Sequence, residues 1–242
     1  MSINNKNYYY EIDDKSQTSI GIKYEKYLFQ SQSKYQSIDV LKTKKYGNIL
    51  YLDKCFMLSE RGNDFYHDEC VNLVPKSAKK ILIIGGGDCG ISSKLLKRKE
   101  IEKIIISEID EEVVNICKKY FPKNFIVNNK NKKRLDIKIS DGMKYVNNSS
   151  EIFDCIIVDS TDPIGEAKKL YSKVFIKNLK GVLSKNGFVI QQCGSPIYDL
   201  KGIINPLRKK YQMLGFKEIL LSSFPMPLYP SGTWSFLRSK RA

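Results

Sequence analysis

The chain has 242 residues, of which 42% are hydrophobic, enough to bury the core of one substantial domain and of a smaller one. No apolar run reaches the roughly 18 residues of a membrane-spanning helix, and residues 1–14 lack the pattern of a signal peptide, so we expect a soluble, cytoplasmic protein. The net charge of +15, from 41 Lys and Arg against 26 Asp and Glu, would suit a nucleic-acid partner, but the lysines are spread among many Ile, Asn and Tyr, which favours background composition.

The first part of the chain predicts a small β-sheet. From residue 18 to 58, apolar and polar residues alternate, as at Ile20 and Ile22, in the manner of short half-buried strands. A capped helix pattern follows and ends before Pro75. We therefore predict an N-terminal β-sheet domain with its linking helix over residues 1–74.

After this helix, strand patterns alternate with helix patterns to the end of the chain. The expected strands are residues 81–85, 103–110, 135–142, 153–160, 187–193, 216–224 and 233–240. Alternation of this kind builds a mostly parallel sheet with helices on both faces. A short Pro-rich turn joins the last two strands, which should therefore pair antiparallel. The prediction is an α/β protein, in which residues 75–242 form a Rossmann-like catalytic domain with a seven-stranded sheet of the class I methyltransferase type.

Acidic side chains stand at the carboxyl ends of the first four of these strands, where open α/β sheets bind their ligands. They are Asp88, Glu108, Asp110, Asp141, Asp159 and Asp162. Any one of them could be an ordinary turn or cap residue, because Asp favours turns. The set of them favours a binding site, and an acidic site in a basic protein favours a cationic ligand.

The turn after the first strand narrows the choice of ligand. Gly85, Gly87 and Gly90 fit the pattern G-x-G-x-x-G, and Glu108 follows Asp88 by 20 residues, as an acid that binds ribose hydroxyls would. Yet Asp88 lies where a pyrophosphate would rest, and like charges ~4 Å apart repel by roughly 1 to 4 kcal/mol. A dinucleotide is therefore disfavoured. A sulfonium nucleoside fits better, above all decarboxylated S-adenosylmethionine, whose tail ends in an amine.

The stretch from Asp159 to Gly165, DSTDPIG, ends the fourth of these strands and opens a loop that runs to Leu170. One interpretation is a capped turn that leads into the next helix. The other, which we favour, is that Asp159 and Asp162 bind an amine while Pro163 shapes a lid that excludes water.

The remaining patterns predict no metal site and no further partner. The six cysteines are scattered without a CxxC pair, and His67 is the only histidine, so we expect reduced, mostly buried thiols. The densest basic cluster (Lys130, Lys132, Lys133 and Arg134) lies in an Asn-rich stretch that we expect to be a solvated loop.

Taken together, the motifs resemble the spermidine synthase family of polyamine aminopropyltransferases. The similar stretches are SKYQSIDV, YGNILYLD, FYHDE, IIGGGDCG, SEID, ISDG, IIVDSTDPIG and YPSGTW, which cover nearly the whole chain. The resemblance implies transfer of the aminopropyl group of decarboxylated S-adenosylmethionine to a polyamine, usually putrescine, giving spermidine and methylthioadenosine. It also implies no tightly bound cofactor, and a homodimer or homotetramer built partly through the N-terminal sheet.

The resemblance also implies roles for single residues around the nucleoside. Gln36, Glu108 and Asp141 would bind it, with Glu108 on the ribose and Asp141 near the adenine. Gly85 and Gly87 would bring the backbone close to it. Asp88 would hold the aminopropyl amine, with His67 nearby.

A second group would surround the acceptor amine, and its implied members are Tyr66, Asp159, Asp162, Gln192 and Tyr229. Asp159 would be the catalytic carboxylate, with Tyr66 and Asp162 beside it. An acceptor amine has a pKa near ~10 and Asp159 an ordinary pKa near ~3.9, so Asp159 would be a weak base for that proton. We therefore expect desolvation to lower the amine pKa or to raise that of Asp159.

Three departures from the family pattern bear on these roles. Met57 stands where relatives commonly have a glutamine that contacts the acceptor, so the preferred amine is left open. Cys89 replaces a glycine of the turn, and Glu166 replaces a proline of the lid.

Two other functions are alternatives. One is an S-adenosylmethionine-dependent N-methyltransferase on the same scaffold. The other is a non-catalytic basic module that binds nucleic acid, which the acidic strand ends argue against.

Overall fold

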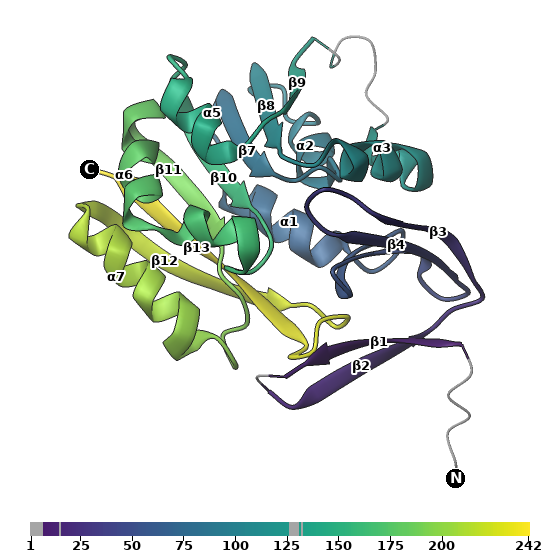
Figure 1. The fold of residues 1–242 in the computed structure, drawn as a ribbon. Coiled ribbons are helices and arrows are strands. Elements are labelled where there is room, and N and C mark those ends of the chain that lie inside the picture. The colour runs from purple at the N-terminus through teal and green to yellow at the C-terminus, as the bar shows by residue number, and fades with distance from the viewer. Residues whose placement is uncertain (1–6, 15, 126–130, 132) are drawn as a thin grey trace.

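The computed structural model describes residues 7–14, 16–125, 131 and 133–242. Within these residues the strands form a seven-stranded sheet, a four-stranded sheet and a two-stranded hairpin. In Figure 1 the four-stranded sheet and the hairpin lie beside the larger sheet, whose two faces are covered by helices. The predicted α/β fold with a small N-terminal β domain is confirmed.

The larger sheet has the order β12-β13-β11-β10-β7-β8-β9. Strands β7 to β11 run parallel, whereas β13 runs antiparallel between β11 and β12, as expected for the last two strands. The chain moves outward from β7 to β9 and then returns to place β10 on the other side of β7, which makes a topological switch point. The strands are β7 (Lys80–Gly85), β8 (Lys103–Glu108), β9 (Leu135–Ile139), β10 (Phe153–Asp159), β11 (Leu183–Gln192), β12 (Phe216–Pro225) and β13 (Thr233–Arg241).

The apolar run of β7 belongs to two cores. Ile81 and Ile83 lie in a core with side chains of α1 and α2, while Leu82 and Ile84 lie in a core with side chains of α5, α6 and α7. Because both faces of the strand are covered, its sequence is apolar throughout rather than alternating. The helices are α1 (Asp64–Leu73), α2 (Gly90–Leu95), α3 (Glu111–Tyr120), α5 (Gly142–Asn148), α6 (Lys173–Val182) and α7 (Asn205–Met213), with shorter turns η1 (Pro122–Phe125), η2 (Gly165–Tyr171) and η3 (Leu200–Ile204).

The small N-terminal sheet has the order β3-β4-β5-β6, and β1 pairs with β2 in the separate hairpin. A third core joins β4 and β5 to α3, so the small sheet is packed against the larger unit. Helix α1 connects the two and packs against α2, β12 and β13. The division between residues 74 and 75 stays a prediction. The strands are β1 (Tyr8–Asp13), β2 (Thr18–Lys23), β3 (Lys26–Gln32), β4 (Ser37–Thr43), β5 (Gly47–Leu52) and β6 (Cys55–Ser59).

Two elements, β1 and α5, were not among the predicted ones. Helix α5 has seven residues, too few for an apolar period to show, and it begins because the Asp141 side chain accepts hydrogen bonds from the N–H groups of Met143 and Lys144. Strand β1 is a run of aromatic and acidic residues that pairs along its whole length with β2.

The expected basic loop needs a correction at Arg134. Lys130 and Lys132 lie outside the described residues, but the Arg134 guanidinium donates hydrogen bonds to the carbonyl oxygens of Leu96 (3.2 Å) and Arg98 (2.7 Å). Arg134 therefore ties the start of β9 to the segment after α2 and is not part of a solvated patch.

The close contact of β7 with β10 yields a stability prediction. Gly85 has a φ of +81°, and a Cβ there would lie 2.0 Å from the backbone oxygen of Asp159. Because that oxygen belongs to the paired strand and cannot turn aside, Gly85→Ala should lower the free energy of unfolding by about 2 kcal/mol or more in urea titrations. Gly181→Ala is the control, since this exposed α6 glycine has open space around it and should gain about 0.5 to 1 kcal/mol. Equal effects of the two substitutions would contradict this account of the turn.

Candidate active site

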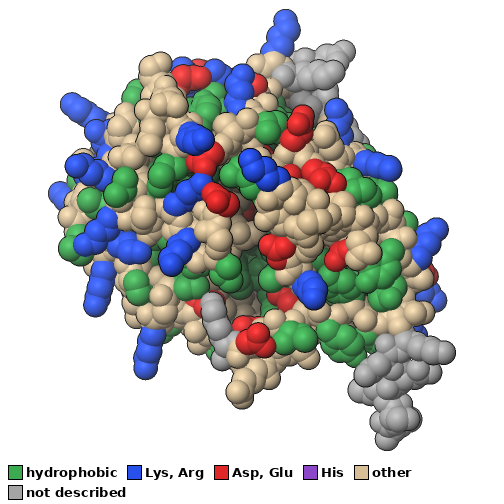
Figure 2. Space-filling model, viewed as in Figure 1, with side chains coloured by type: hydrophobic (Ala, Val, Ile, Leu, Met, Phe, Trp, Pro, Cys, Tyr) green, Lys and Arg blue, Asp and Glu red, His purple; other side chains and the backbone are tan. Residues whose placement is uncertain are grey.

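The carboxyl ends of β7, β8 and β10 meet at the switch point. Gly85 pairs with Asp159, and the Gly86 N–H donates to the backbone oxygen of Asp159 at 3.1 Å. Figure 2 shows a hollow near the centre of this face, bordered by acidic side chains, while most Lys and Arg side chains project from its outer edge. On this face, acidic side chains therefore gather at the hollow, although some basic side chains lie near it.

Glu108, at the end of β8, is buried and held by backbone groups. Its Oε2 accepts from the Gly87 N–H at 3.2 Å and its Oε1 from the Asp110 N–H at 2.9 Å. Burial raises the pKa of Glu108 to about 7, although these N–H groups act to lower it. Gln36 reaches the same place from the turn between β3 and β4, where its Nε2 donates to Asp110 Oδ2 at 3.0 Å. The structure thus brings two of the predicted nucleoside residues, Gln36 and Glu108, together around Asp110.

The glycine turn after β7 is packed tightly by other parts of the protein. A Cβ at Gly90 would lie 2.0 Å from the His67 ring, and one at Gly87 would lie 3.0 Å from Glu108 Cγ. Cys89 has a φ of +59° in the left-handed region, which costs a side chain about 1 to 2 kcal/mol. Gly87 and Gly90 need glycine because side chains of the site lie against the turn, whereas position 89 carries a side chain at that cost.

Asp88 and His67 form a buried pair at this turn. His67 Nε2 lies 3.0 Å from Asp88 Oδ2, and Asp88 Oδ1 accepts from the Gly90 N–H at 2.9 Å. Desolvation alone would lower the pKa of His67, but the charge of Asp88 and their hydrogen bond raise it overall. Asp88 thus stabilises a cation in this place, and an ammonium group of a ligand would meet the same carboxylate.

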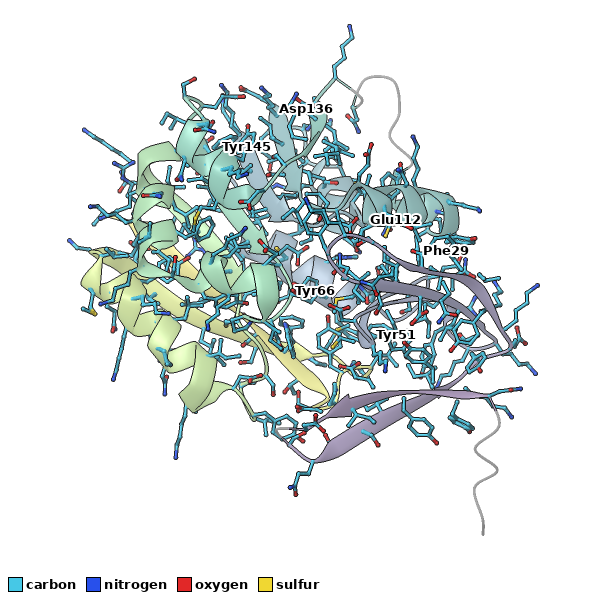
Figure 3. The ribbon with its side chains drawn as sticks, viewed as in Figure 1. Phe29, Tyr51, Tyr66, Glu112, Asp136 and Tyr145 are labelled. Carbon is cyan, nitrogen blue, oxygen red and sulfur yellow. The ribbon has the colours of Figure 1, made fainter. Side chains whose placement is uncertain are left out.

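Asp159 is the central carboxylate of the hollow. The Tyr66 hydroxyl donates to Asp159 Oδ1 at 2.5 Å. Desolvation and the charge of Asp88 raise the pKa of Asp159 to about 6, in part opposed by the Tyr66 hydrogen bond and by His67. The pKa of Asp159 is therefore raised, as expected for the carboxylate that the resemblance predicts to be catalytic. In Figure 3, Tyr66 lies at the centre of the molecule on α1, and its ring packs against Phe236 at 4.9 Å between centroids.

Tyr229 lies in the turn between β12 and β13. Its ring makes edge contacts with Trp234 at 4.6 Å and Phe56 at 5.8 Å between centroids. Burial raises the pKa of Tyr229 well above its usual value, and the charges of Asp159, Glu11 and Asp162 raise it further. The structure therefore brings Tyr229 to the same charged centre, with its hydroxyl kept neutral.

Gln192, at the end of β11, is buried with its side chain fully hydrogen-bonded. Its Nε2 donates to the Ser160 oxygen at 2.7 Å and to the Tyr171 hydroxyl at 2.8 Å. Its Oε1 accepts from Trp234 Nε1 at 3.0 Å and from the Gly194 N–H at 3.3 Å. These bonds use both N–H groups and both lone pairs of the amide. The predicted contact of Gln192 with an acceptor amine would have to replace one of them.

Glu11 is a site residue that the sequence patterns did not single out. It lies on β1 and accepts from the Phe56 N–H at 2.9 Å. Burial raises the pKa of Glu11 to about 7, opposed by the Phe56 bond and increased by the charge of Asp162. The sequence YYYEID gives no signal for it, because the strand exposes the apolar Ile12 and places Glu11 on the same half-buried face as Tyr9.

Asp141, at the end of β9, divides its oxygens between a helix and a lysine. Oδ1 caps α5, and Oδ2 accepts from Lys169 Nζ. Lys169 belongs to the lid segment (residues 162–170) and also donates to Glu166 Oε2 at 2.6 Å. Desolvation acts to raise the pKa of Asp141, but the lysine and the capping N–H groups bring it below its usual value.

The six cysteines are free, five of them buried and Cys55 exposed. Over the part of the chain that the structure describes, no group of three or more His, Cys, Asp or Glu side chains is arranged to hold a metal ion. The polar side chains described at the strand ends are carboxylates, tyrosines, two glutamine amides, one imidazole and one lysine.

Comparison with known proteins assigns the chain to a family. Residues 63–242 match the spermine/spermidine synthase domain, and residues 8–60 match the spermidine synthase tetramerisation domain. The chain belongs to the spermine/spermidine synthase family. A polyamine aminopropyltransferase of Methanocaldococcus jannaschii is 37% identical over 229 residues, which are 92% of this chain and 76% of that one. One of Clostridium botulinum is 39% identical over 221 residues, 89% of this chain and 76% of the relative.

Solved structures of the family share the whole fold. A spermidine synthase in complex with the transition state analogue AdoDATO superposes with a TM-score of 0.86 at 28% identity, over 97% of this chain and 80% of that one. The spermidine synthase from Thermotoga maritima gives a TM-score of 0.84 at 29% identity, over 97% of this chain and 79% of its own. The predicted family and the methyltransferase-type sheet are confirmed.

The raised pKa of Asp159 predicts a gain in stability when its charge is removed. Its contribution favours folding below the unfolded pKa of 3.8 and is lost as the pH rises through about 6. Two pKa units correspond to about 3 kcal/mol, so Asp159→Asn should raise the free energy of unfolding at pH 8 by about 1 to 3 kcal/mol. At pH 4.5 the gain should shrink to about a third of that value.

Urea titrations of this synthase-family protein at the two pH values measure the effect. Asp14→Asn, a change at an exposed carboxylate, is the control and should alter stability by less than about 0.5 kcal/mol at both. A loss of stability for Asp159→Asn at pH 8 would contradict the view that burial of this charge is costly.

Proposed function

We propose that this chain is a polyamine aminopropyltransferase that moves the aminopropyl group of decarboxylated S-adenosylmethionine to putrescine, giving spermidine and methylthioadenosine. The observation that carries the proposal is the partly buried Asp159, hydrogen-bonded by Tyr66 and raised in pKa to about 6, beside the Asp88 turn. Membership of a family whose relatives are named polyamine aminopropyltransferases supports it.

For the nucleoside, the proposed ligands follow the strand ends outward from Asp88. The Asp88 carboxylate, which pairs with His67, would bind the ammonium group at the end of the aminopropyl tail. Glu108 would bind the ribose hydroxyls, and Gln36 would close that side from the N-terminal sheet. Asp141 would accept a hydrogen bond from the amino group of the adenine. Decarboxylated S-adenosylmethionine acts here as a co-substrate and not as a resident cofactor.

Asp159 is proposed to act as the base toward the acceptor amine. Proton transfer from an amine of pKa ~10 to a carboxylate of pKa near 4 costs about 8 kcal/mol, and raising the carboxylate to about 6 removes about 3 of these. Tyr66 holds Oδ1 and so leaves Oδ2 for the amine. The neutral nitrogen then attacks the carbon next to the sulfonium, and the positive charge of the sulfur is lost as methylthioadenosine leaves. Alignment of the acceptor nitrogen with the carbon next to the sulfonium is proposed to supply a further part of the rate enhancement.

The acceptor is proposed to be a diamine because the outer part of the site has its own carboxylates. Glu11 and Asp162 interact electrostatically with each other and with the Tyr229 hydroxyl. A second ammonium group at this end would relieve their repulsion. Met57 packs against the core between the small sheet and α3 and offers no hydrogen bond to an amine. Length and charge, rather than a glutamine contact, would therefore select the acceptor.

The oligomer is proposed to be a homodimer or homotetramer. Residues 8–60 match a tetramerisation domain, and Ile12 of the hairpin is 69% exposed, which suits burial against another subunit. No helix within the described ranges has the length and apolarity needed to cross a membrane. We place the protein in the cytoplasm, where free thiols such as its six cysteines stay reduced.

Incubation with decarboxylated S-adenosylmethionine and a panel of amines, with product masses read directly, tests the proposal. The panel is putrescine, cadaverine, agmatine and spermidine. We expect methylthioadenosine with every productive amine and the largest yield with putrescine. Asp159→Asn should keep nucleoside binding but lose about 10² to 10⁴ of the turnover, the usual contribution of a general base. Near-normal turnover of this variant would rule out Asp159 as the base, and no aminopropylated product with any amine would rule out the proposed function.

A further inference from the structure

Lys169 joins two carboxylates that belong to different parts of the site. Its Nζ donates to Asp141 Oδ2, at the start of α5, and to Glu166 Oε2 within its own lid segment. The lid follows β10 and α5 follows β9, and in the sheet these strands are separated by β7 and β8. The Lys169–Asp141 pair therefore connects the segment after β10 with the segment after β9, across the ends of β7 and β8.

Asp141 has one oxygen left for any ligand. The N–H groups of Met143 (2.8 Å) and Lys144 (3.1 Å) occupy Oδ1, which caps α5. Lys169 occupies Oδ2, and the Asp141 side chain is only 14% exposed. With so little of the side chain open, the amino group of a base and the lysine ammonium compete for the same oxygen.

Lys169 has a second hydrogen-bond partner, Glu166, which it can keep when it leaves Asp141. Glu166 lies three residues earlier, and its side chain is 64% exposed while that of Lys169 is 31% exposed. An ammonium that leaves Asp141 would keep this pair and gain water, so the release costs little. Release from Asp141 would therefore leave Lys169 paired with Glu166 alone.

We propose that Lys169 is a positioning residue that holds the lid to Asp141, as a latch, when no nucleoside is bound. When the nucleoside binds, Lys169 leaves Asp141, and this carboxylate accepts a hydrogen bond from the amino group of the adenine. The inference rests on the proposed function, since it takes Asp141 as the acceptor for the amino group of the base. Glu166 then assists release, because it is the partner that Lys169 keeps once Asp141 is given up. Because coupling is reciprocal, weakening the Lys169–Asp141 pair strengthens nucleoside binding, and strengthening the pair weakens it.

This predicts opposite effects for two substitutions in the same segment. Lys169→Met frees Asp141 and should tighten the binding of methylthioadenosine by about two- to five-fold, the range of a partly exposed ion pair. Glu166→Gln removes the partner that Lys169 keeps when it leaves Asp141, so release costs more and binding should weaken by about two-fold. The double variant should behave like Lys169→Met, since Glu166 acts only through the lysine.

Isothermal titration calorimetry with methylthioadenosine measures these affinities. This ligand is uncharged, so a change in the net charge of the site does not by itself alter its binding. Lys168→Met is the matched control, because this neighbouring lysine is exposed in the same segment and should leave the affinity unchanged. Lys169→Arg should restore the wild-type affinity to within about two-fold, since it keeps the cation.

The outcomes separate the latch from the function on which it rests. If the wild-type protein fails to bind methylthioadenosine, the proposed function is overturned and the latch with it. If the wild-type protein binds but Lys169→Met binds more weakly, Lys169 is a ligand of the nucleoside and the latch is overturned alone. The latch is also overturned, without the proposed function, if Lys169→Met and Glu166→Gln shift the affinity in the same direction or leave it unchanged.

Discussion

Negative charges held partly out of water at the junction of β7 and β10 govern the rest of this site. Asp88 and Asp159 come together because the strands pair as far as Gly85, and the charge of Asp88 raises the cost of ionising Asp159. The Tyr66 hydroxyl, which donates to Asp159, and the His67 imidazole, which pairs with Asp88, offset part of this cost. The proposed co-substrate, with an ammonium group at one end and a sulfonium in the middle, would supply the remaining positive charge. The acidic centre and the basic surface therefore do not conflict, because they lie in different places.

The glycine turn makes this junction possible. At Gly85 a backbone oxygen of β10 fills the space of a Cβ, and at Gly90 the His67 ring does so. The turn therefore brings a carboxylate, an imidazole and a strand end within hydrogen-bonding reach, before any ligand binds. Lys169 of the lid segment adds an ion pair to Asp141, and in the proposed latch this pair links the position of the lid to nucleoside binding.

Those parts of the fold that depend on buried, regular patterns were predictable from the sequence. The run from Ile81 to Ile84 marked a covered parallel strand, and the acidic residues that end the neighbouring strands marked the edge where the structure brings Asp88 and Asp159 together. Helix α5 escaped prediction because its start depends on one side-chain cap rather than on an apolar period. Glu11 and Lys169 escaped because each acts on a residue distant in sequence, Asp162 and Asp141, and only the folded chain brings such pairs together.

The central claim is that Asp88 makes the turn after β7 a holder of a cationic tail rather than of an anionic one. Titration of the wild-type protein with decarboxylated S-adenosylmethionine and with S-adenosylmethionine tests this most directly, because the two differ by one carboxylate next to the amine. Repulsion of about 1 to 4 kcal/mol between that carboxylate and Asp88 predicts at least about five-fold tighter binding of the decarboxylated form. Equal affinities, or a preference for S-adenosylmethionine, would contradict the account and point to methyl transfer instead.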